Sequence, residues 1–118
     1  MKIMFQFSIL RQEVHVMEKS LIEEELNEVW KSYLSLVDGI MAEGALSAKI
    51  KELMAVVLSI AGHCEPCIRI HLRRAIKLGA TRKEIAESIA VTLLMMGGPI
   101  DVWTRSTIKE VMDQLRAI

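Results

Sequence analysis

Apolar residues recur at spacings of three and four along nearly all of the chain after residue 17, which is the period of an amphipathic helix. Most glycines and Pro99 fall between these stretches, and Pro66 fits the first turn of a helix, so these residues mark where one helix ends and the next begins. The same part of the sequence has no run of β-branched residues that is bounded by turn residues. The pattern therefore predicts an all-α fold, a bundle of about five or six helices.

We expect five main helices, over 18–43, 48–61, 64–78, 82–96 and 100–116. Ser47 is a suitable N-cap for the second, and Thr81 with Glu84 has the spacing of a capping box for the fourth. The second helix is apolar on nearly every side, which predicts burial in the domain or in an interface. Residues 1–16 fit a strand or a helix equally well, and we interpret residues 1–17 as an N-terminal extension. Residues 18–118 are then a single domain.

Length and composition limit the classes of protein that this chain can belong to. Its 118 residues suit one domain, and 52% hydrophobic with 25% charged residues excludes intrinsic disorder. The longest uncharged stretches, 53–64 and 88–100, are too short to span a membrane. Residues 46–83 carry eight positive and two negative charges but no aromatic side chain for base stacking, so we expect no nucleic-acid partner. The apolar excess favours a homo-oligomer.

Cys64 and Cys67 form the sequence Cys-x-x-Cys at the start of the third predicted helix. We find no secretion signal and expect a cytoplasmic protein, where this spacing indicates redox or metal chemistry rather than a structural staple. The free N–H groups and the dipole at a helix start favour a thiolate at Cys64. Cys67 lies one turn further on, and His71 follows on the same helix face.

Glu52 is a further candidate site residue and lies on the preceding predicted helix, 48–61. It lies ten residues before the turn at Gly62-His63, and His71 lies eight residues after it. At 1.5 Å per residue these separations are about 15 Å and 12 Å, so an antiparallel hairpin would bring Glu52 within a turn of His71. A buried carboxylate needs a partner, and a neighbouring lysine is the alternative to His71. His63 is either an auxiliary site residue or only part of the turn.

The composite of Glu52, Cys64-x-x-Cys67 and His71 resembles the signature of the alkylhydroperoxidase D-like proteins, which belong to the carboxymuconolactone decarboxylase superfamily. The resemblance extends over roughly residues 46–103 and includes Gly79-Ala80-Thr81 and Gly97-Gly98-Pro99. It implies an alkylhydroperoxidase D-like helical bundle that assembles into homo-oligomers, often trimers or hexamers.

The resemblance also implies an enzyme, a peroxidase that reduces hydroperoxides through its thiols and needs no cofactor and no metal. In that scheme Cys67 attacks the peroxide, Cys64 resolves the resulting sulfenic acid to a disulfide, and Glu52 and His71 relay the proton. A dithiol donor then restores the thiols. Well-studied peroxidases of this kind usually carry a histidine between the cysteines. Here Glu65-Pro66 occupies that place, and His63 lies just outside the pair.

Three other interpretations stay open. The decarboxylase branch of the superfamily lacks the cysteine pair, which makes decarboxylation the weaker alternative. A helical zinc module could use the two cysteines, His71 and either Glu52 or His63, but a second separated ligand pair is absent from the sequence. A helical assembly protein without activity could keep the motif as a relic. The nearby basic residues are interpreted as a solvated face: Arg69, Arg73, Arg74 and Lys77.

Overall fold

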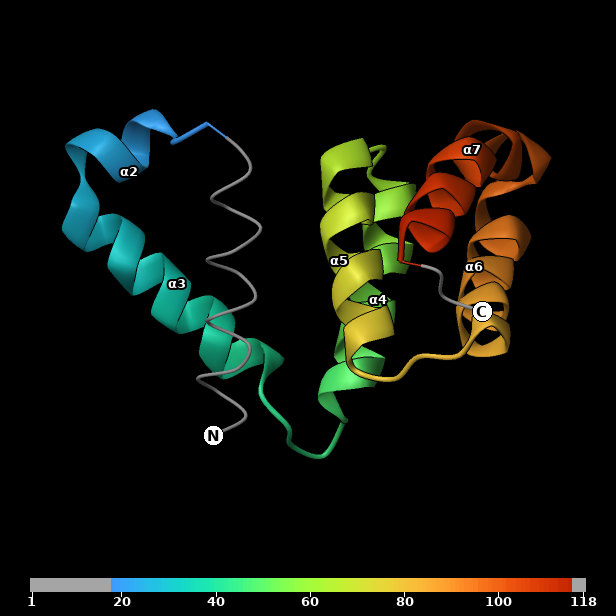
Figure 1. Cartoon of the computed structure of the whole chain (residues 1–118), viewed down its shortest axis with the longest axis horizontal. Helices are drawn as coiled ribbons and strands as arrows, with labels where there is room; N and C mark the ends of the chain where they lie inside the picture. Colours follow the sequence, from blue (N-terminus) through green and yellow to red (C-terminus); the bar gives the residue numbers. More distant parts are fainter. Residues whose placement is uncertain (1–17, 116–118) are drawn as a thin grey trace. The chain divides into compact units, whose positions relative to one another are not determined.

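The computed structural model describes residues 18–115, so the predicted N-terminal extension lies outside the described residues. All the regular elements that it describes are helices, which confirms the all-α prediction. They are α2 (Leu21–Glu25), α3 (Asn27–Met41), α4 (Ala48–Ala61), α5 (Glu65–Lys77), α6 (Arg82–Met96) and α7 (Gly98–Gln114). Figure 1 shows them along the chain. The described residues divide into two compact units on either side of the boundary between Ser47 and Ala48. A single domain over 18–118 stays a prediction.

The first unit corrects one prediction, because the helix expected over 18–43 is broken in two. Leu26 has φ −129° and ψ 57°, outside the helical region, and separates α2 from α3. Ser20 caps α2 by accepting a hydrogen bond from the backbone N–H of Glu23. α3 ends at Met41, before the helix end that the sequence predicts at Gly44. Most of the apolar stripe predicted over 18–43 is exposed, on α2, on α3 and at the break between them: Ile22, Leu26, Val29, Tyr33 and Ile40.

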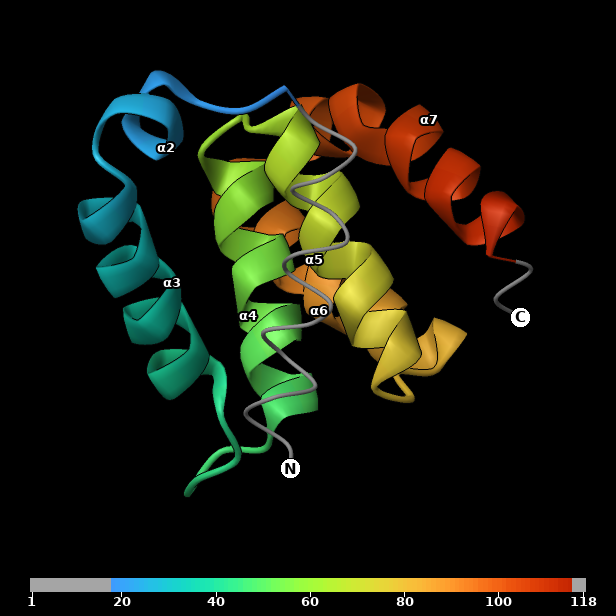
Figure 2. The same ribbon diagram turned by 60° about the vertical axis from the view of Figure 1, so that its left-hand side comes forward.

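The second unit contains the four helices that position the candidate site. α4 and α5 form an antiparallel hairpin and lie side by side in both Figure 1 and Figure 2. α6 packs against α4 and α7, and α7 packs against α5. The centre of this bundle consists of fully buried aliphatic side chains: Val56, Ile60, Ile68, Leu72 and Val111. The predicted capping box of Thr81 and Glu84 is present at the start of α6.

The turn between α4 and α5 fixes where the cysteines begin. His63 adopts φ 53°, a left-handed conformation that is uncommon for residues other than glycine. A Cβ at Gly62 would lie 3.2 Å from the carbonyl oxygen of Leu58, so the turn suits glycine there. The N–H of Cys64 donates back to the carbonyl of Ser59 in α4. The chain therefore reverses direction in a tight turn, and Cys64 lies directly before the first residue of α5.

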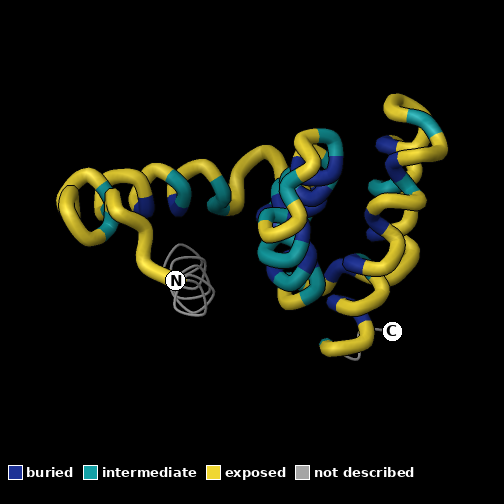
Figure 3. The backbone as a smooth tube through the Cα atoms, turned by 90° about the horizontal axis from the view of Figure 1, so that it is seen from above, coloured by how far each residue is buried: buried dark blue, intermediate teal, exposed yellow. Residues whose placement is uncertain are grey.

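Burial within the second unit is uneven, as the colouring of Figure 3 shows. One side of α4 packs inward, whereas Ile50, Met54 and Leu58 are exposed on the other. These side chains line a groove of about 430 Å³ whose other wall includes Val91 of α6. Within residues 18–115, none of the helices has the length and apolar character needed to cross a membrane.

Candidate functional site

Cys64 and Cys67 are joined by a disulfide at the N-terminus of α5, with their Cα atoms 5.2 Å apart. Cys64 is the N-cap residue, and its sulfur accepts a hydrogen bond from the backbone N–H of Cys67 at 3.3 Å. Pro66 lies in the first turn, where the missing N–H of proline costs nothing. Both cysteines are partly buried. The sequence thus places both sulfurs where free helix N–H groups would stabilise a thiolate after reduction.

The structure brings Glu52 and His71 into direct contact, as the hairpin geometry predicts. The Nδ1 atom of His71 lies 2.7 Å from Oε2 of Glu52. The Glu52 side chain is fully buried, whereas that of His71 is 25% exposed. In the tautomer that carries its proton on Nδ1, His71 donates to the carboxylate, and the lone pair of Nε2 is then able to accept a proton. Because Cys67 and His71 are four residues apart on α5, their side chains are neighbours.

Arg74 is a further member of this cluster, and its interpretation as part of a solvated face is wrong. Its residue is only 2% exposed. Its Nη1 atom lies 3.9 Å from Oε1 of Glu52, the carboxylate oxygen that does not face His71. Arg74 follows His71 by three positions and Cys67 by seven, which places all three on one helix face. That spacing was the available signal, but the neighbouring Arg69, Arg73 and Lys77 favoured a uniformly basic surface.

His63, the possible auxiliary residue, lies in the turn and faces another helix. Its ring centroid is 4.8 Å from that of Trp103 on α7. Trp103 is 39% exposed and had no role in the sequence-based site. An aromatic contact between residues so far apart in sequence cannot be found from helical periodicity. The contact joins the turn that carries Cys64 to the first half of α7.

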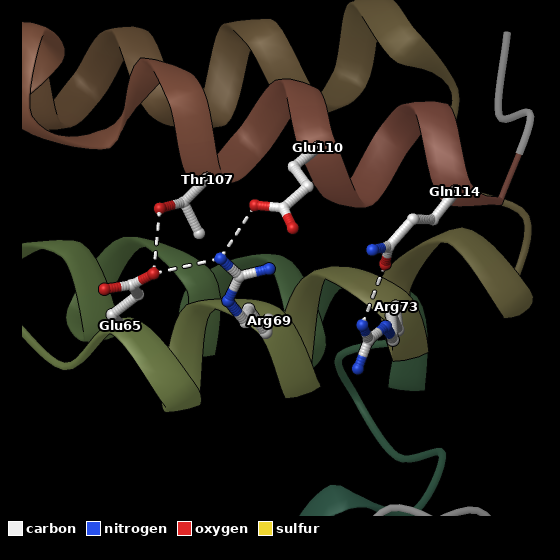
Figure 4. A network of polar contacts seen from close by, with 6 residues as sticks. All are labelled: Glu65, Arg69, Arg73, Thr107, Glu110 and Gln114. Atoms are coloured by element: carbon white, nitrogen blue, oxygen red, sulfur yellow. Dashed lines mark hydrogen bonds and ion pairs between the residues drawn. The ribbon is translucent and has the colours of Figure 1, made fainter.

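Polar side-chain contacts join α5 to α7, as Figure 4 shows. Arg69 donates to Glu65 and to Glu110, each at 2.9 Å. The Thr107 hydroxyl donates to Glu65 at 3.4 Å. The hydrogen bond to Glu110 is the main cause that raises the pKa of Arg69, and the hydrogen bond to Glu65 is the next largest. The hydrogen bond between Arg69 and Glu110 also lowers the pKa of Glu110. The negative charge of Glu65 near Cys64 is therefore paired with a cation.

Arg73 makes a similar connection further along α5, because it donates to the side-chain oxygen of Gln114 at 3.0 Å. Arg69 and Arg73 thus fasten α5 to α7 instead of forming a free basic surface. Within residues 18–115, no three histidine, cysteine or acidic side chains come together in a way that could hold a metal ion.

A model of the carboxymuconolactone decarboxylase family matches residues 27–115, which is well over half of the sequence. The chain belongs to this family. A carboxymuconolactone decarboxylase family protein from Legionella pneumophila is 30% identical, with a TM-score of 0.74 over 91% of this chain and 95% of that one. Another from Thermotoga maritima is 33% identical, with a TM-score of 0.66 over 77% of this chain and 91% of that one. A part in the antioxidative response is suggested for the Thermotoga protein.

Two sequence relatives are described only as uncharacterised proteins. One, from Cupriavidus necator, is 35% identical over 78 residues, which are 63% of this chain and 69% of the relative. The other, protein 4 in the cox locus of Paracoccus denitrificans, is 36% identical over 67 residues, 57% of this chain and 60% of the relative. Membership of the carboxymuconolactone decarboxylase family agrees with the resemblance that the cysteine, histidine and glutamate pattern indicates.

Proposed function

We propose that this member of the carboxymuconolactone decarboxylase family is a thiol–disulfide redox enzyme that reduces hydroperoxides. One observation carries the proposal. A disulfide at a helix start shares a helix face with a histidine, and a buried carboxylate binds that histidine through its Nδ1 atom. A structural cysteine pair needs neither partner. The antioxidative part suggested for the Thermotoga relative supports the same chemistry.

The reaction starts from the dithiol. Nε2 of His71 takes the proton of Cys67, and the thiolate attacks the terminal oxygen of the hydroperoxide. The S–O bond forms as the O–O bond breaks, and the departing alkoxide receives the proton from His71, which gives an alcohol. Cys67 is now a sulfenic acid. The sulfur of Cys64 attacks the sulfur of Cys67, the S–S bond forms as the S–O bond breaks, and the proton of the Cys64 thiol goes to the departing hydroxyl group, which leaves as water.

Turnover then needs two electrons and two protons from a dithiol donor, which exchanges with the disulfide and becomes oxidised. We propose that the enzyme works in the cytoplasm, where such donors are kept reduced. We also propose a homo-oligomer, a trimer or hexamer, because both units expose large apolar side chains. Nucleic acid has no role in this scheme.

Mass spectrometry of the reduced protein after one equivalent of hydroperoxide tests the proposal. We expect loss of two hydrogens within one chain and consumption of the peroxide. Cys64→Ser removes the resolving thiol, so a sulfenic acid at Cys67 becomes trappable by a dione reagent. Cys67→Ser should consume no peroxide.

Three results would contradict these roles. The first is sulfenic acid at Cys64 with retained turnover in Cys67→Ser, which would exchange the two cysteines. The second is oxidation beyond sulfenic acid without any disulfide. The third is a bound metal ion that protects both thiols, which would favour a metal module instead.

A further inference from the structure

We propose that Arg74 is a positioning residue of this site. Its buried guanidinium offsets the negative charge of the Glu52 carboxylate, and that carboxylate holds His71 in the tautomer that carries its proton on Nδ1. The catalytic consequence rests on the proposed function, whereas the tautomer itself does not. Arg74 does not contact the reacting sulfur in this assignment, and it acts through Glu52 and His71.

The burial of Glu52 requires a compensating charge. Its side chain is fully buried on α4, and an ionised carboxylate in such a place is costly unless it is paired. Neutral His71 supplies a hydrogen bond but no charge. Arg74 supplies a permanent charge, since a guanidinium keeps its proton in proteins. Its own burial, with 3% of the side chain exposed, removes the water that would otherwise weaken the attraction.

The two carboxylate oxygens have separate roles in this arrangement. Oε2 lies 2.7 Å from Nδ1 of His71, and Oε1 lies 3.9 Å from Nη1 of Arg74. In the part of the chain that the structure describes, no hydrogen-bond donor reaches Oε1. Arg74 therefore acts on Glu52 by charge at that oxygen and leaves the other oxygen to His71. The series Cys67, His71 and Arg74 on one face of α5 places the cation two turns from the thiol.

Loss of the cation changes what His71 can do. In general, a buried carboxyl group without a nearby cation favours its neutral, protonated form. The protonated carboxyl group donates its O–H, so Nδ1 of His71 becomes the acceptor and the imidazole proton moves to Nε2. A histidine with its proton on Nε2 cannot accept the proton of Cys67. Arg74 thus determines the direction in which the histidine transfers protons, although it lies away from the sulfur.

Nitrogen-15 NMR of the histidine side chains at neutral pH tests this inference directly, with the signals of His71 assigned by their loss in His71→Gln. Wild type should show the Nδ1–H tautomer. Arg74→Met should show mainly Nε2–H, and its reduced form should react with iodoacetamide at Cys67 about tenfold or more slowly, because base catalysis is lost. Arg74→Lys keeps the charge and should retain the Nδ1–H tautomer. Arg73→Met, at the position just before Arg74 on α5, is the matched control and should leave the tautomer of His71 and the alkylation rate of Cys67 unchanged.

An Nδ1–H tautomer and a wild-type alkylation rate in folded Arg74→Met would overturn the inference. If that variant does not fold, Arg74→Gln keeps the polar side chain without its charge, and the same two results in it decide the question equally. A switch to Nε2–H in Arg74→Lys would also count against a role for charge. If the tautomers behave as expected while wild type fails to consume hydroperoxide, the proposed function is wrong and this inference stands.

Discussion

At the scale of single residues, His71 and Glu52 are expected to act on Cys67 as one unit. Glu52→Gln and His71→Gln should each slow the reaction of the reduced protein with hydroperoxide by about 10²–10⁴-fold, the usual value of general acid–base catalysis. The double variant should be barely slower than either single one, because each change already disables the shared proton transfer. Stopped-flow measurement of peroxide consumption gives all three rates.

His63→Gln is the matched control for this pair, since His63 lies next to Cys64 but packs against Trp103. It should keep most of the wild-type rate. Losses in Glu52→Gln and His71→Gln that multiply in the double variant would show that the two side chains act independently. A large loss in His63→Gln would instead assign it the auxiliary role.

The pairing of Glu52 with His71 could be predicted because it depends only on the helical rise and on a hairpin at Gly62-His63. Arg74 could not be placed in the same way. Helical spacing puts it on the face of His71, but whether a side chain at that angle is buried depends on what the neighbouring helices leave uncovered. Sequence periodicity alone does not indicate how deeply a long charged side chain is buried.

At the scale of helices, the start of α6 should make stability depend on pH. Glu84 accepts from Lys49 and from the backbone N–H of Thr81, both at 3.1 Å. The hydrogen bond from Lys49 is the main cause that lowers the pKa of Glu84 below its ordinary value of 4.5, and the hydrogen bond from Thr81 is the next largest. The resulting stabilisation is complete above the ordinary value and is lost as the pH falls through the lowered one.

Glu84→Gln should therefore lower the unfolding free energy at pH 7 and make it less dependent on pH below about pH 4.5. Urea unfolding followed by circular dichroism across pH 3 to 7 measures both effects. Glu87→Gln, a change at an exposed position on the same helix, is the control and should leave the curve of wild type unchanged. Parallel pH curves for wild type and Glu84→Gln would refute the expectation.

The helices with strong end signals were predictable to within a few residues. α4 has the predicted bounds, and the Thr81 box starts α6 where expected. The break at Leu26 was not predictable, because no glycine or proline marks it and the apolar spacing continues across it. A single residue whose φ and ψ lie outside the helical region ends one helix and begins another, and the spacing of apolar residues in the sequence does not change.

At the scale of the whole molecule, the exposed apolar side chains predict self-association. Leu58 of α4 is 68% exposed beside the apolar groove, and Leu94 of α6 is 82% exposed. Light scattering should give a multiple of the chain mass of 13.3 kDa. Leu58→Glu should lower the measured mass, because a charge in an apolar interface is costly. Monomeric wild-type protein at micromolar concentration would contradict the expectation.

The sequence contains an excess of apolar residues, but it does not indicate which surface of the folded chain exposes them. An apolar stripe has the same period whether it packs within a chain or against a second copy. The exposed stripe of the first unit is one example, since its spacing predicts a core face and the side chains are uncovered in the single chain. Only the packed structure separates the two kinds of face.

The depth at which the Glu52–Arg74 pair is buried bears on the heat resistance of this protein. A buried ion pair replaced by apolar side chains of similar size is often neutral or gains about 1–4 kcal/mol of stability. We therefore expect Glu52→Leu combined with Arg74→Met to melt at or above the temperature of the wild type while losing its thiol reactivity. Differential scanning calorimetry would measure this, and a clearly lower melting temperature would contradict it. Where the double variant melts higher, heat resistance gained at this pair removes the proposed proton relay, so a variant that keeps the relay has to gain its heat resistance elsewhere in the chain.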